Sequence, residues 1–139
     1  SVIGVKKEKE MNFSEWAFHD VEPIYLQLIQ KIEYAILSKQ LSAGEKLPSV
    51  REMAKLLHIS PNTVMKAYTH LKHLELVVSP TNRHYSVIAN EQYIFQKREE
   101  KAKELSCLYL SNMIRLGFSK KEATDFLIEY SNTLKELNK

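Results

Sequence analysis

Residues 49–74 read SVREMAKLLHISPNTVMKAYTHLKHL, which predicts two short helices joined by a tight corner. Ser49 and Glu52 have the spacing of a capping box, in which each side chain accepts a hydrogen bond from the other residue's backbone N–H. Ser60 predicts a second N-cap, and Pro61 follows at the first helical position, where its missing N–H costs nothing. Apolar residues of the first helix recur at Val50, Met53, Ala54 and Leu57.

The second of these helices is predicted to have one buried side and one exposed side. The buried side contains Val64, Ala67, Tyr68, Leu71 and Leu74. The exposed side contains Asn62, Met65, Lys66, Thr69 and His73. These exposed side chains are long enough to read the edges of bases. The pattern is typical of a helix-turn-helix, although an ordinary helical hairpin within a core would show a similar spacing.

The residues before this stretch predict one longer helix and an N-terminal arm over residues 1–22. Pro23 begins the helix, which runs to about residue 39. Its apolar side contains Tyr25, Leu28, Ile29, Ile32 and Ile36, and its wet side contains Gln27, Gln30, Lys31 and Glu33. Residues 1–10 form a flexible polar leader in this interpretation. The aromatic residues Phe13, Trp16 and Phe18 predict that the rest of the arm packs on the body of the protein or on a partner subunit.

The residues after the second helix predict a β-ribbon. Residues 76–78 and 85–88 are rich in β-branched residues, and the segment between them has the composition of a turn. Gly44 predicts an earlier turn, and Lys46 and Leu47 a short extended piece. A helix, a helix-turn-helix and a two-stranded wing together predict a winged helix-turn-helix domain over residues 23–89. The fold class is therefore mainly α with a small β-wing.

Residues 90–139 predict a two-helix extension. One helix covers residues 91–116 and ends at Gly117, and a capping box from Ser119 to Glu122 begins the next. A short antiparallel pair cannot bury all the apolar residues of these helices, so we expect a dimerisation domain. The expected dimer contacts are Leu105, Leu108, Tyr109, Met113, Phe126, Leu127, Tyr130 and Leu134, with Leu137 on the same helical spacing. Two helices also leave no room for a ligand cavity of the usual size.

Charge is distributed unevenly along the 139 residues. The net charge is +3 overall, but residues 23–88 alone have +4. An excess of positive charge over the helix-turn-helix favours an anionic partner.

Several other classes of protein are not indicated. No apolar run approaches the length of a membrane span and no signal peptide is visible, so we expect a cytoplasmic protein without a membrane partner. Cys107 is the single cysteine and falls in an apolar stretch, which predicts a packed thiol. His70 and His73 are spaced like metal ligands but have no recognisable third ligand. With no catalytic motif either, we expect neither a cofactor nor an enzyme.

The whole domain resembles the DNA-binding domain of the GntR family of bacterial transcriptional regulators. Two motifs show the resemblance at fixed spacing. The first consists of Leu47, Pro48, Ser49, Arg51 and Ala54, and the second of Pro61, Asn62, Thr63, Val64, Ala67 and Tyr68. The short two-helix tail is similar to that of the YtrA subfamily. This resemblance implies a homodimeric regulator, often a repressor, that binds double-stranded operator DNA as an inverted repeat.

The resemblance and the helix-turn-helix geometry together indicate the DNA-binding residues. They are Ser49, Arg51, Ser60, Asn62, Thr63, Lys66, Arg83 and His84. Arg51 is expected at phosphate and Asn62 at adenine; the alternatives are a surface ion pair for Arg51 and purely capping roles for Ser60 and Thr63. The chain departs from the family at Met65, where many members have arginine, and in the wing, where Asn82 and His84 replace a Gly-x-Gly pair. The remaining alternative for the whole domain is a winged helix that binds only other proteins.

Overall fold

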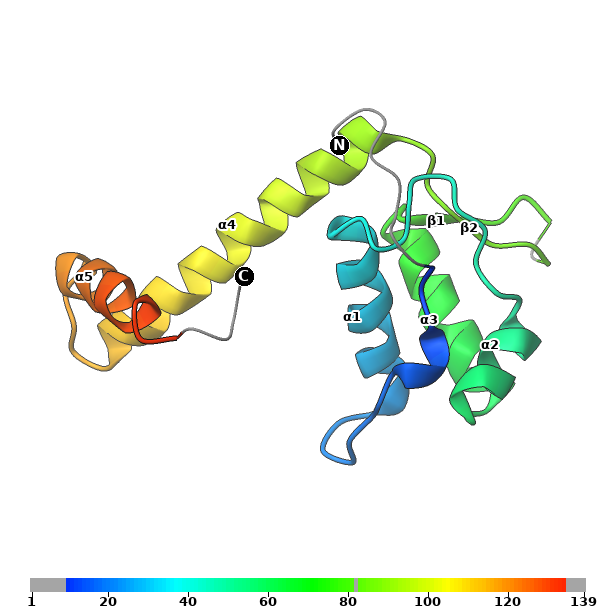
Figure 1. Ribbon diagram of the computed structural model, residues 1–139, viewed down its shortest axis with the longest axis horizontal. Coiled ribbons are helices and arrows are strands. Elements are labelled where there is room, and N and C mark those ends of the chain that lie inside the picture. The colour runs from blue at the N-terminus through cyan, green and yellow to red at the C-terminus, as the bar shows by residue number, and fades with distance from the viewer. Residues whose placement is uncertain (1–9, 82, 135–139) are drawn as a thin grey trace. The chain divides into compact units, whose positions relative to one another are not determined.

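The structure is a computed structural model that describes residues 10–81 and 83–134 (Figure 1). The elements in order are a 3-10 helix η1 (Phe13–Glu15), α1 (Ile24–Leu37), α2 (Val50–Leu57), α3 (Pro61–His73), β1 (Val77–Val78), β2 (Ser86–Val87), α4 (Glu91–Arg115) and α5 (Lys120–Ser131). This mainly helical chain with a small two-stranded sheet confirms the predicted fold class. Two compact units divide the chain at residues 98 and 99, within α4, whereas the sequence predicted a boundary after residue 89.

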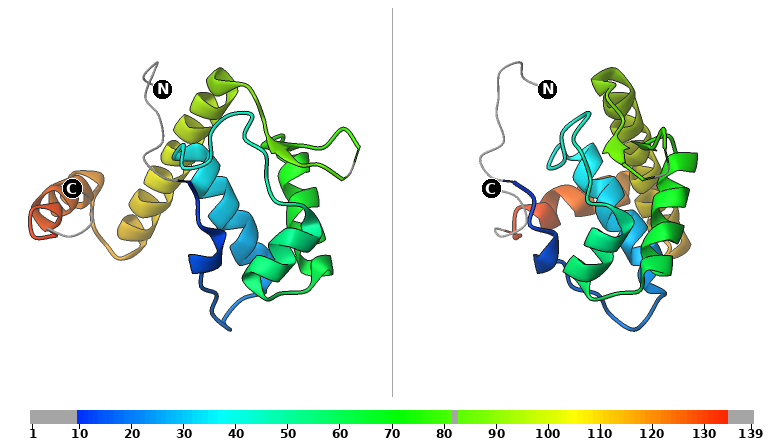
Figure 2. Two further views of the ribbon diagram at one scale, coloured as in Figure 1. Left: turned by 45° about the vertical axis from the view of Figure 1, so that its right-hand side comes forward. Right: turned by 90° about the vertical axis from the view of Figure 1, so that its right-hand side faces the viewer.

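The first unit is built around one apolar core between α1, α2, α3 and the β-ribbon (Figure 2). Helix α3 packs against α1, α2 and β1, so it lies at the centre of the unit. The largest fully buried side chains are Tyr68, Leu28, Ile32, Ile36, Leu41, Met53, Leu71, Val64, Val77 and Val87. The predicted apolar sides of α1, α2 and α3 therefore face a common core.

The corner between α2 and α3 is fixed by capping at both ends. The hydroxyl of Ser49 accepts from the N–H of Glu52 at 3.1 Å, and the carboxylate of Glu52 accepts from the N–H of Ser49 at 2.9 Å. Helix α2 ends at Leu57, and its C-cap His58 adopts a left-handed conformation with φ 57° and donates its N–H to the Ala54 carbonyl. Helix α3 begins at the N-cap Ser60. The two caps predicted from the sequence are confirmed.

The wing is a short antiparallel ribbon with a third chain segment along its edge. Val77 pairs with Val87, and Val78 pairs with Ser86. Lys46 forms an isolated bridge with Ser86 on the other side of β2, and the Leu47 N–H donates to the Tyr85 carbonyl at 2.8 Å. The predicted extended piece before α2 therefore anchors the wing to the helix-turn-helix.

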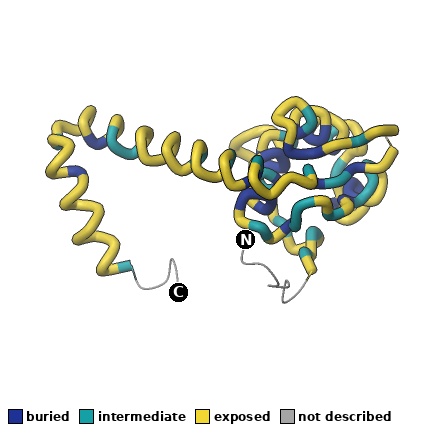
Figure 3. The backbone as a smooth tube through the Cα atoms, turned by 90° about the horizontal axis from the view of Figure 1, so that it is seen from above, coloured by how far each residue is buried: buried dark blue, intermediate teal, exposed yellow. Residues whose placement is uncertain are grey.

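The second unit is a helical hairpin with a very small core. Among its described residues, only Met113 and Ala123 are buried, and Tyr109 donates to the Ala123 carbonyl at 2.8 Å. Gly117, with φ 100°, lies in the turn between α4 and α5. The sequence predicted this glycine as the end of the first tail helix. Most of this unit is exposed along both helices (Figure 3).

Three predictions about individual apolar residues and Cys107 are wrong, two concerning burial and one concerning the extent of a helix. Leu74 is 37% exposed: α3 ends at His73, and Leu74 is the C-cap at the end of the buried stripe. Helix α5 ends at Ser131, so Leu134 follows the helix instead of extending it, and Leu137 lies outside the described residues. Cys107 is exposed because its side of α4 has no covering element within the unit.

The N-terminal arm packs on the first unit, as its aromatic residues predicted. Phe13 and Trp16 meet edge to face, with ring centroids 5.0 Å apart, and both pack against the core together with Met11 and Phe18. The ammonium of Lys31 on α1 lies 5.6 Å from the centroid of the Phe18 ring. The predicted leader lies outside the described residues apart from residue 10.

Gln27 was predicted on the wet side of α1, and this prediction is wrong. Its side chain is only 4% exposed because it binds the backbone of the arm. The amide nitrogen donates to the carbonyls of His19 at 2.8 Å and Glu22 at 2.7 Å, and the amide oxygen accepts from the His19 N–H at 3.0 Å. One side chain therefore fastens the arm to α1 through three hydrogen bonds.

Replacing Gln27 by alanine is expected to detach this part of the arm and to lower the free energy of unfolding by about 1–3 kcal/mol, because a buried network loses its central partner. Trp16 is the only tryptophan, so its emission should shift to longer wavelength as the arm becomes wetter. The matched control is Gln30→Ala on the exposed side of the same helix. Equal emission and equal stability of the two variants would contradict a fastening role for Gln27.

Candidate nucleic-acid interface

Arg51 projects from the first turn of α2, where backbone N–H groups at a helix start are available to an anion. Its side chain is exposed, and no ion pair involving Arg51 is present among the residues that the structure describes. The neighbouring Glu52 is already engaged with Ser49. The surface ion pair considered as the alternative is therefore not formed with any described residue, and the exposed guanidinium can approach a phosphate.

The capping box also affects the ionisation of the Glu52 carboxyl at the start of α2. Hydrogen bonds from Ser49, above all from its backbone, lower the pKa of Glu52. A carboxylate whose pKa is lowered on folding stabilises the protein above its ordinary pKa, and this stabilisation is lost as pH falls through the lowered value. The first turn of α2 is therefore capped throughout the neutral range. The Ser49 hydroxyl still has its own proton to donate.

The first turn of α3 contains two residues that cap the helix and one residue whose side chain is available to a ligand. The hydroxyls of Ser60 and Thr63 lie 2.8 Å apart, and the Ser60 oxygen also accepts from the Thr63 N–H at 3.1 Å. Asn62 lies between them in sequence, is exposed, and has no hydrogen-bond partner among the described residues. The carboxamide of Asn62 is therefore the group of this turn with all its donors and acceptors available.

Two tyrosines position the next residues of α3, and sequence reasoning missed both roles. The ammonium of Lys66 lies 5.2 Å from the centroid of the Tyr25 ring on α1, a cation–π geometry. The Met65 sulfur accepts from the Tyr85 hydroxyl at 3.8 Å, although Met65 stays 42% exposed. Lys66 is thereby held towards α1 and Met65 towards the wing. The sequence gives no local signal for either contact, because the partners are far apart along the chain.

Arg83 and His84 lie in the loop between β1 and β2, and both are exposed. In Figure 1 this loop and α2 lie towards the same side of the first unit. The predicted turn residue Asn82 lies outside the described residues. The structure therefore brings the predicted contact residues of α2, α3 and the wing into one compact unit.

Tyr68 holds these elements in register. Its hydroxyl donates to the Pro48 carbonyl at 2.7 Å, and its ring lies 4.6 Å from the ring of Tyr85. Burial raises the pKa of Tyr68 far above its ordinary value, so the phenol remains a donor over the whole range in which the protein is folded. The centre of α3 is thus tied both to the turn before α2 and to the base of the wing.

The part of the chain that the structure describes shows neither a cluster of metal-binding side chains nor a membrane-spanning helix. No group of three histidine, cysteine, aspartate or glutamate side chains is arranged to hold a metal ion there. The described helices also include none that is long and apolar enough to cross a membrane.

A capped two-helix corner with an exposed polar second helix and an adjoining β-ribbon defines the class of winged helix-turn-helix DNA-binding proteins. Residues 24–84 match the family described as bacterial regulatory proteins, gntR family. The chain is 30% identical over 105 residues to an uncharacterized HTH-type transcriptional regulator, YhcF of Bacillus subtilis, and covers 87% of it and 76% of itself. The chain belongs to the GntR family of bacterial transcriptional regulators.

Other relatives agree with this assignment. The HTH-type transcriptional repressor YtrA of Bacillus subtilis is 48% identical over 50 residues, which are 36% of this chain and 38% of YtrA. A solved GntR family transcriptional regulator from Listeria monocytogenes has a TM-score of 0.74 at 30% identity, over 81% of this chain and 98% of its own. A transcriptional regulator from Oenococcus oeni has a TM-score of 0.66 at 26% identity, over 84% and 97% respectively. The expected likeness to YtrA is confirmed, and the family and these relatives are regulators of transcription, not enzymes.

Arg51→Ala is expected to weaken binding to all DNA sequences, because a phosphate contact positions the protein without reading bases. The slope of log K against log salt should fall by about one unit. Lys55→Ala is the matched control, since it removes an exposed positive charge from the last turn of the same helix. Equal affinities and slopes for the two variants, measured by fluorescence anisotropy, would show that Arg51 does not contact phosphate.

Asn62→Ala is expected to act on specificity instead. Loss of a bidentate contact to adenine should cost about 1–3 kcal/mol at one or two base pairs of each half-site and leave binding to random DNA nearly unchanged. The measurement is competition between cognate and single-substituted duplexes. A uniform loss of affinity for cognate and random duplexes alike would contradict a base contact by Asn62.

Proposed function

We propose that the protein is a homodimeric repressor that binds an inverted-repeat operator in bacterial cytoplasm. Each first unit would read one half-site, with Arg51 and Ser49 at phosphate, Asn62 and Lys66 in the major groove, and Arg83 and His84 at the wing. Ser60 and Thr63 would contribute mainly by fixing the helix start, since their hydroxyls bind each other. The membership of the GntR family and the exposed α3 surface support this reading.

The main support for a dimer is the number of large apolar side chains that the second unit leaves exposed. Leu105, Leu108, Phe126, Leu127 and Tyr130 are between 45% and 57% exposed. Phe126 and Tyr130 stack on α5 with ring centroids 6.0 Å apart, which gives a continuous aromatic surface. A contiguous apolar surface of this kind marks an interface in a water-soluble protein. A two-fold partner would cover the same surface on both copies.

Three of the predicted dimer residues have a different position in the hairpin. Met113 is buried between α4 and α5, Tyr109 is half-buried through its bond to Ala123, and Leu134 follows α5. In the proposed dimer they support the exposed residues from behind or at the margin. The remaining five residues would form the contact itself.

In the proposed dimer, the linkage of two units would raise the affinity for the operator. One winged unit offers few phosphate and base contacts, so its affinity alone should be low. When one unit is bound, the second experiences a high effective concentration of its half-site. The likeness to YtrA, which is 48% identical over 50 residues and is named as a repressor, supports repression as the mode of action. A bound dimer would block access of polymerase to the operator.

The alternative is a winged helix used only for protein interaction. It predicts no salt-dependent binding to DNA. The positive charge of residues 23–88 and the two available side chains Arg51 and Asn62 favour DNA.

The double substitution Phe126→Glu with Tyr130→Glu is expected to give a folded monomer at micromolar concentration, because four like charges would be buried in the two-fold interface. Non-specific DNA binding should persist, whereas affinity for a selected full-length site should fall by about two orders of magnitude or more. Sedimentation velocity and titration of the same preparation measure the two effects together.

The control for this experiment is Thr124→Glu with Ser131→Glu, which adds the same charge to other exposed positions of α5. This control should remain a dimer with the original affinity. Should the Phe126 and Tyr130 variant stay dimeric, or bind the full site undiminished as a monomer, the second unit would have no part in operator binding.

A further inference from the structure

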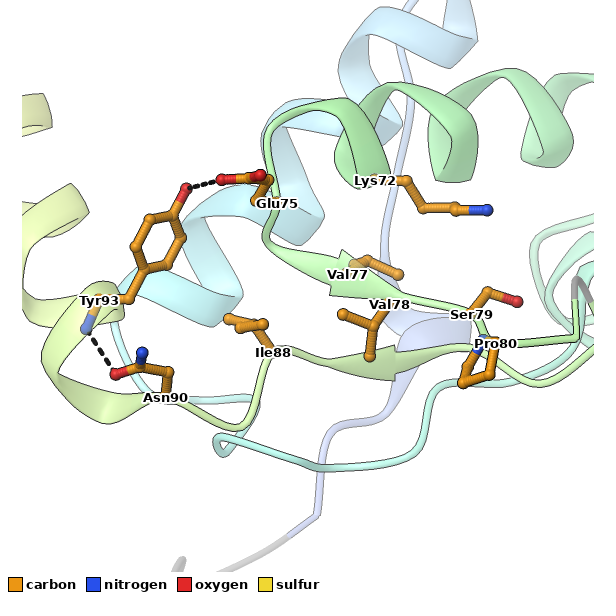
Figure 4. Close-up of a pocket in the computed structure, with 9 residues that line it drawn as sticks. All are labelled: Lys72, Glu75, Val77, Val78, Ser79, Pro80, Ile88, Asn90 and Tyr93. Carbon is orange, nitrogen blue, oxygen red and sulfur yellow. Dashed lines mark hydrogen bonds between the residues drawn. The ribbon is translucent and has the colours of Figure 1, made fainter.

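The first unit contains a groove of about 590 Å³ between the end of α3, the wing and the start of α4 (Figure 4). This volume is within the range of small-molecule sites. The groove lies wholly among residues 72–93, outside the second unit. We propose that this groove binds a small amphipathic carboxylate with a branched or aromatic body, and that its occupancy alters operator binding.

One end of the groove is built to meet a negative group. Lys72 contributes a positive charge to the lining from the last turn of α3. The hydroxyl oxygen of Ser79 is buried and has no hydrogen-bond partner among the described residues. In Figure 4 both groups lie at the end of the groove that continues into the wing loop. A buried hydroxyl without a partner is uncommon in folded proteins, and a carboxylate is an acceptor that suits both a hydroxyl and an ammonium.

The middle of the groove is apolar. Val78 is 37% exposed although it lies on a strand, and Pro80 and Ile88 line the groove beside it. Apolar side chains at a groove floor favour a ligand that has an apolar body as well as its charged end. A bare phosphate ion would leave this floor uncovered.

The opposite end of the groove is closed by internal hydrogen bonds. The Tyr93 hydroxyl donates to the Leu74 carbonyl at 3.0 Å and lies 3.5 Å from a carboxylate oxygen of Glu75. The side-chain oxygen of Asn90 accepts from the Tyr93 N–H at 3.0 Å. The acidic Glu75 makes this end unsuitable for a second negative group, so the ligand is a monocarboxylate with its charge at Lys72 and Ser79.

A ligand in this position contacts three elements at once. Lys72 belongs to the recognition helix, Val78 to the wing strand β1, and Tyr93 to the first turn of α4. Strand β1 leads into the loop with Arg83 and His84, so ligand contacts at its base shift the equilibrium of wing positions on DNA. This coupling rests on the proposed function, whereas ligand binding itself does not.

The test uses the full chain labelled with ¹⁵N and titrated with sodium 4-methylpentanoate. We expect saturable chemical-shift changes at groove residues, with a dissociation constant on the order of 1 mM or tighter for so small a ligand. The neutral 4-methylpentanamide should bind about tenfold more weakly, because it cannot form a charge-assisted pair with Lys72. Inorganic phosphate should cause no comparable shifts.

Two variants separate ligand binding from folding. Ser79→Ala should weaken 4-methylpentanoate binding about fivefold without lowering the thermal midpoint, since the hydroxyl has no partner to lose. Val78→Trp should fill the groove and abolish the shifts, and it should fold because Val78 is partly exposed. Thr81→Ala, an exposed hydroxyl outside the lining, is the matched control and should bind normally.

Ligand binding, its coupling to DNA binding and the proposed function would each fail in a different way. Absence of saturable shifts, equal shifts from the amide or from phosphate, or an unchanged affinity in Ser79→Ala would each overturn the carboxylate site. With the site confirmed, 4-methylpentanoate should change operator affinity in the original protein but not in Val78→Trp. An unchanged operator affinity at saturating ligand would overturn the coupling, and failure to bind any DNA without ligand would instead contradict the proposed function.

Discussion

The hydrogen bond from the Tyr68 hydroxyl to the Pro48 carbonyl is the constraint on which the DNA-binding surface depends. It joins the middle of the recognition helix to the turn that precedes α2. Because the phenol is buried, leaving it unpaired would be costly, so the two segments are held at one distance. The contact between the tilted rings of Tyr68 and Tyr85 extends the same constraint to the base of the wing. The positions of Arg51, Asn62 and Arg83 relative to one another follow from this one core residue.

The polar residues of the surface fall into two groups according to what they bind within the chain. The short hydroxyl side chains of Ser49, Ser60 and Thr63 cap the helix starts, and this fixes the backbone of each first turn. The longer side chains of Arg51 and Asn62 have no such internal partners among the described residues. A surface organised in this way keeps its geometry before a ligand arrives, so less conformational entropy is lost on binding.

The features that could be predicted from sequence are those that local physics determines. Capping boxes, the proline at the start of α3 and the turn at Gly117 each act within a few residues, and all were predicted correctly. Apart from the helix ends near Leu74 and Leu134, the wrong or missing predictions concern contacts between distant residues. Gln27 is buried by the backbone of the arm, and Met65 is positioned by Tyr85, twenty residues away. Likewise, no pattern along the chain indicates that Ser79 is buried without a partner.

The most direct test of this account is to select duplex DNA from a random pool with the purified full chain and to sequence the bound fragments. Two winged units related by a two-fold axis should enrich an inverted repeat whose half-site centres lie about 10–10.5 base pairs apart or a multiple of that distance. Asn62 predicts an adenine at a fixed position in each half. A pool without enrichment, or one enriched in a single half-site or a direct repeat, would contradict the reading of an operator by a symmetric dimer.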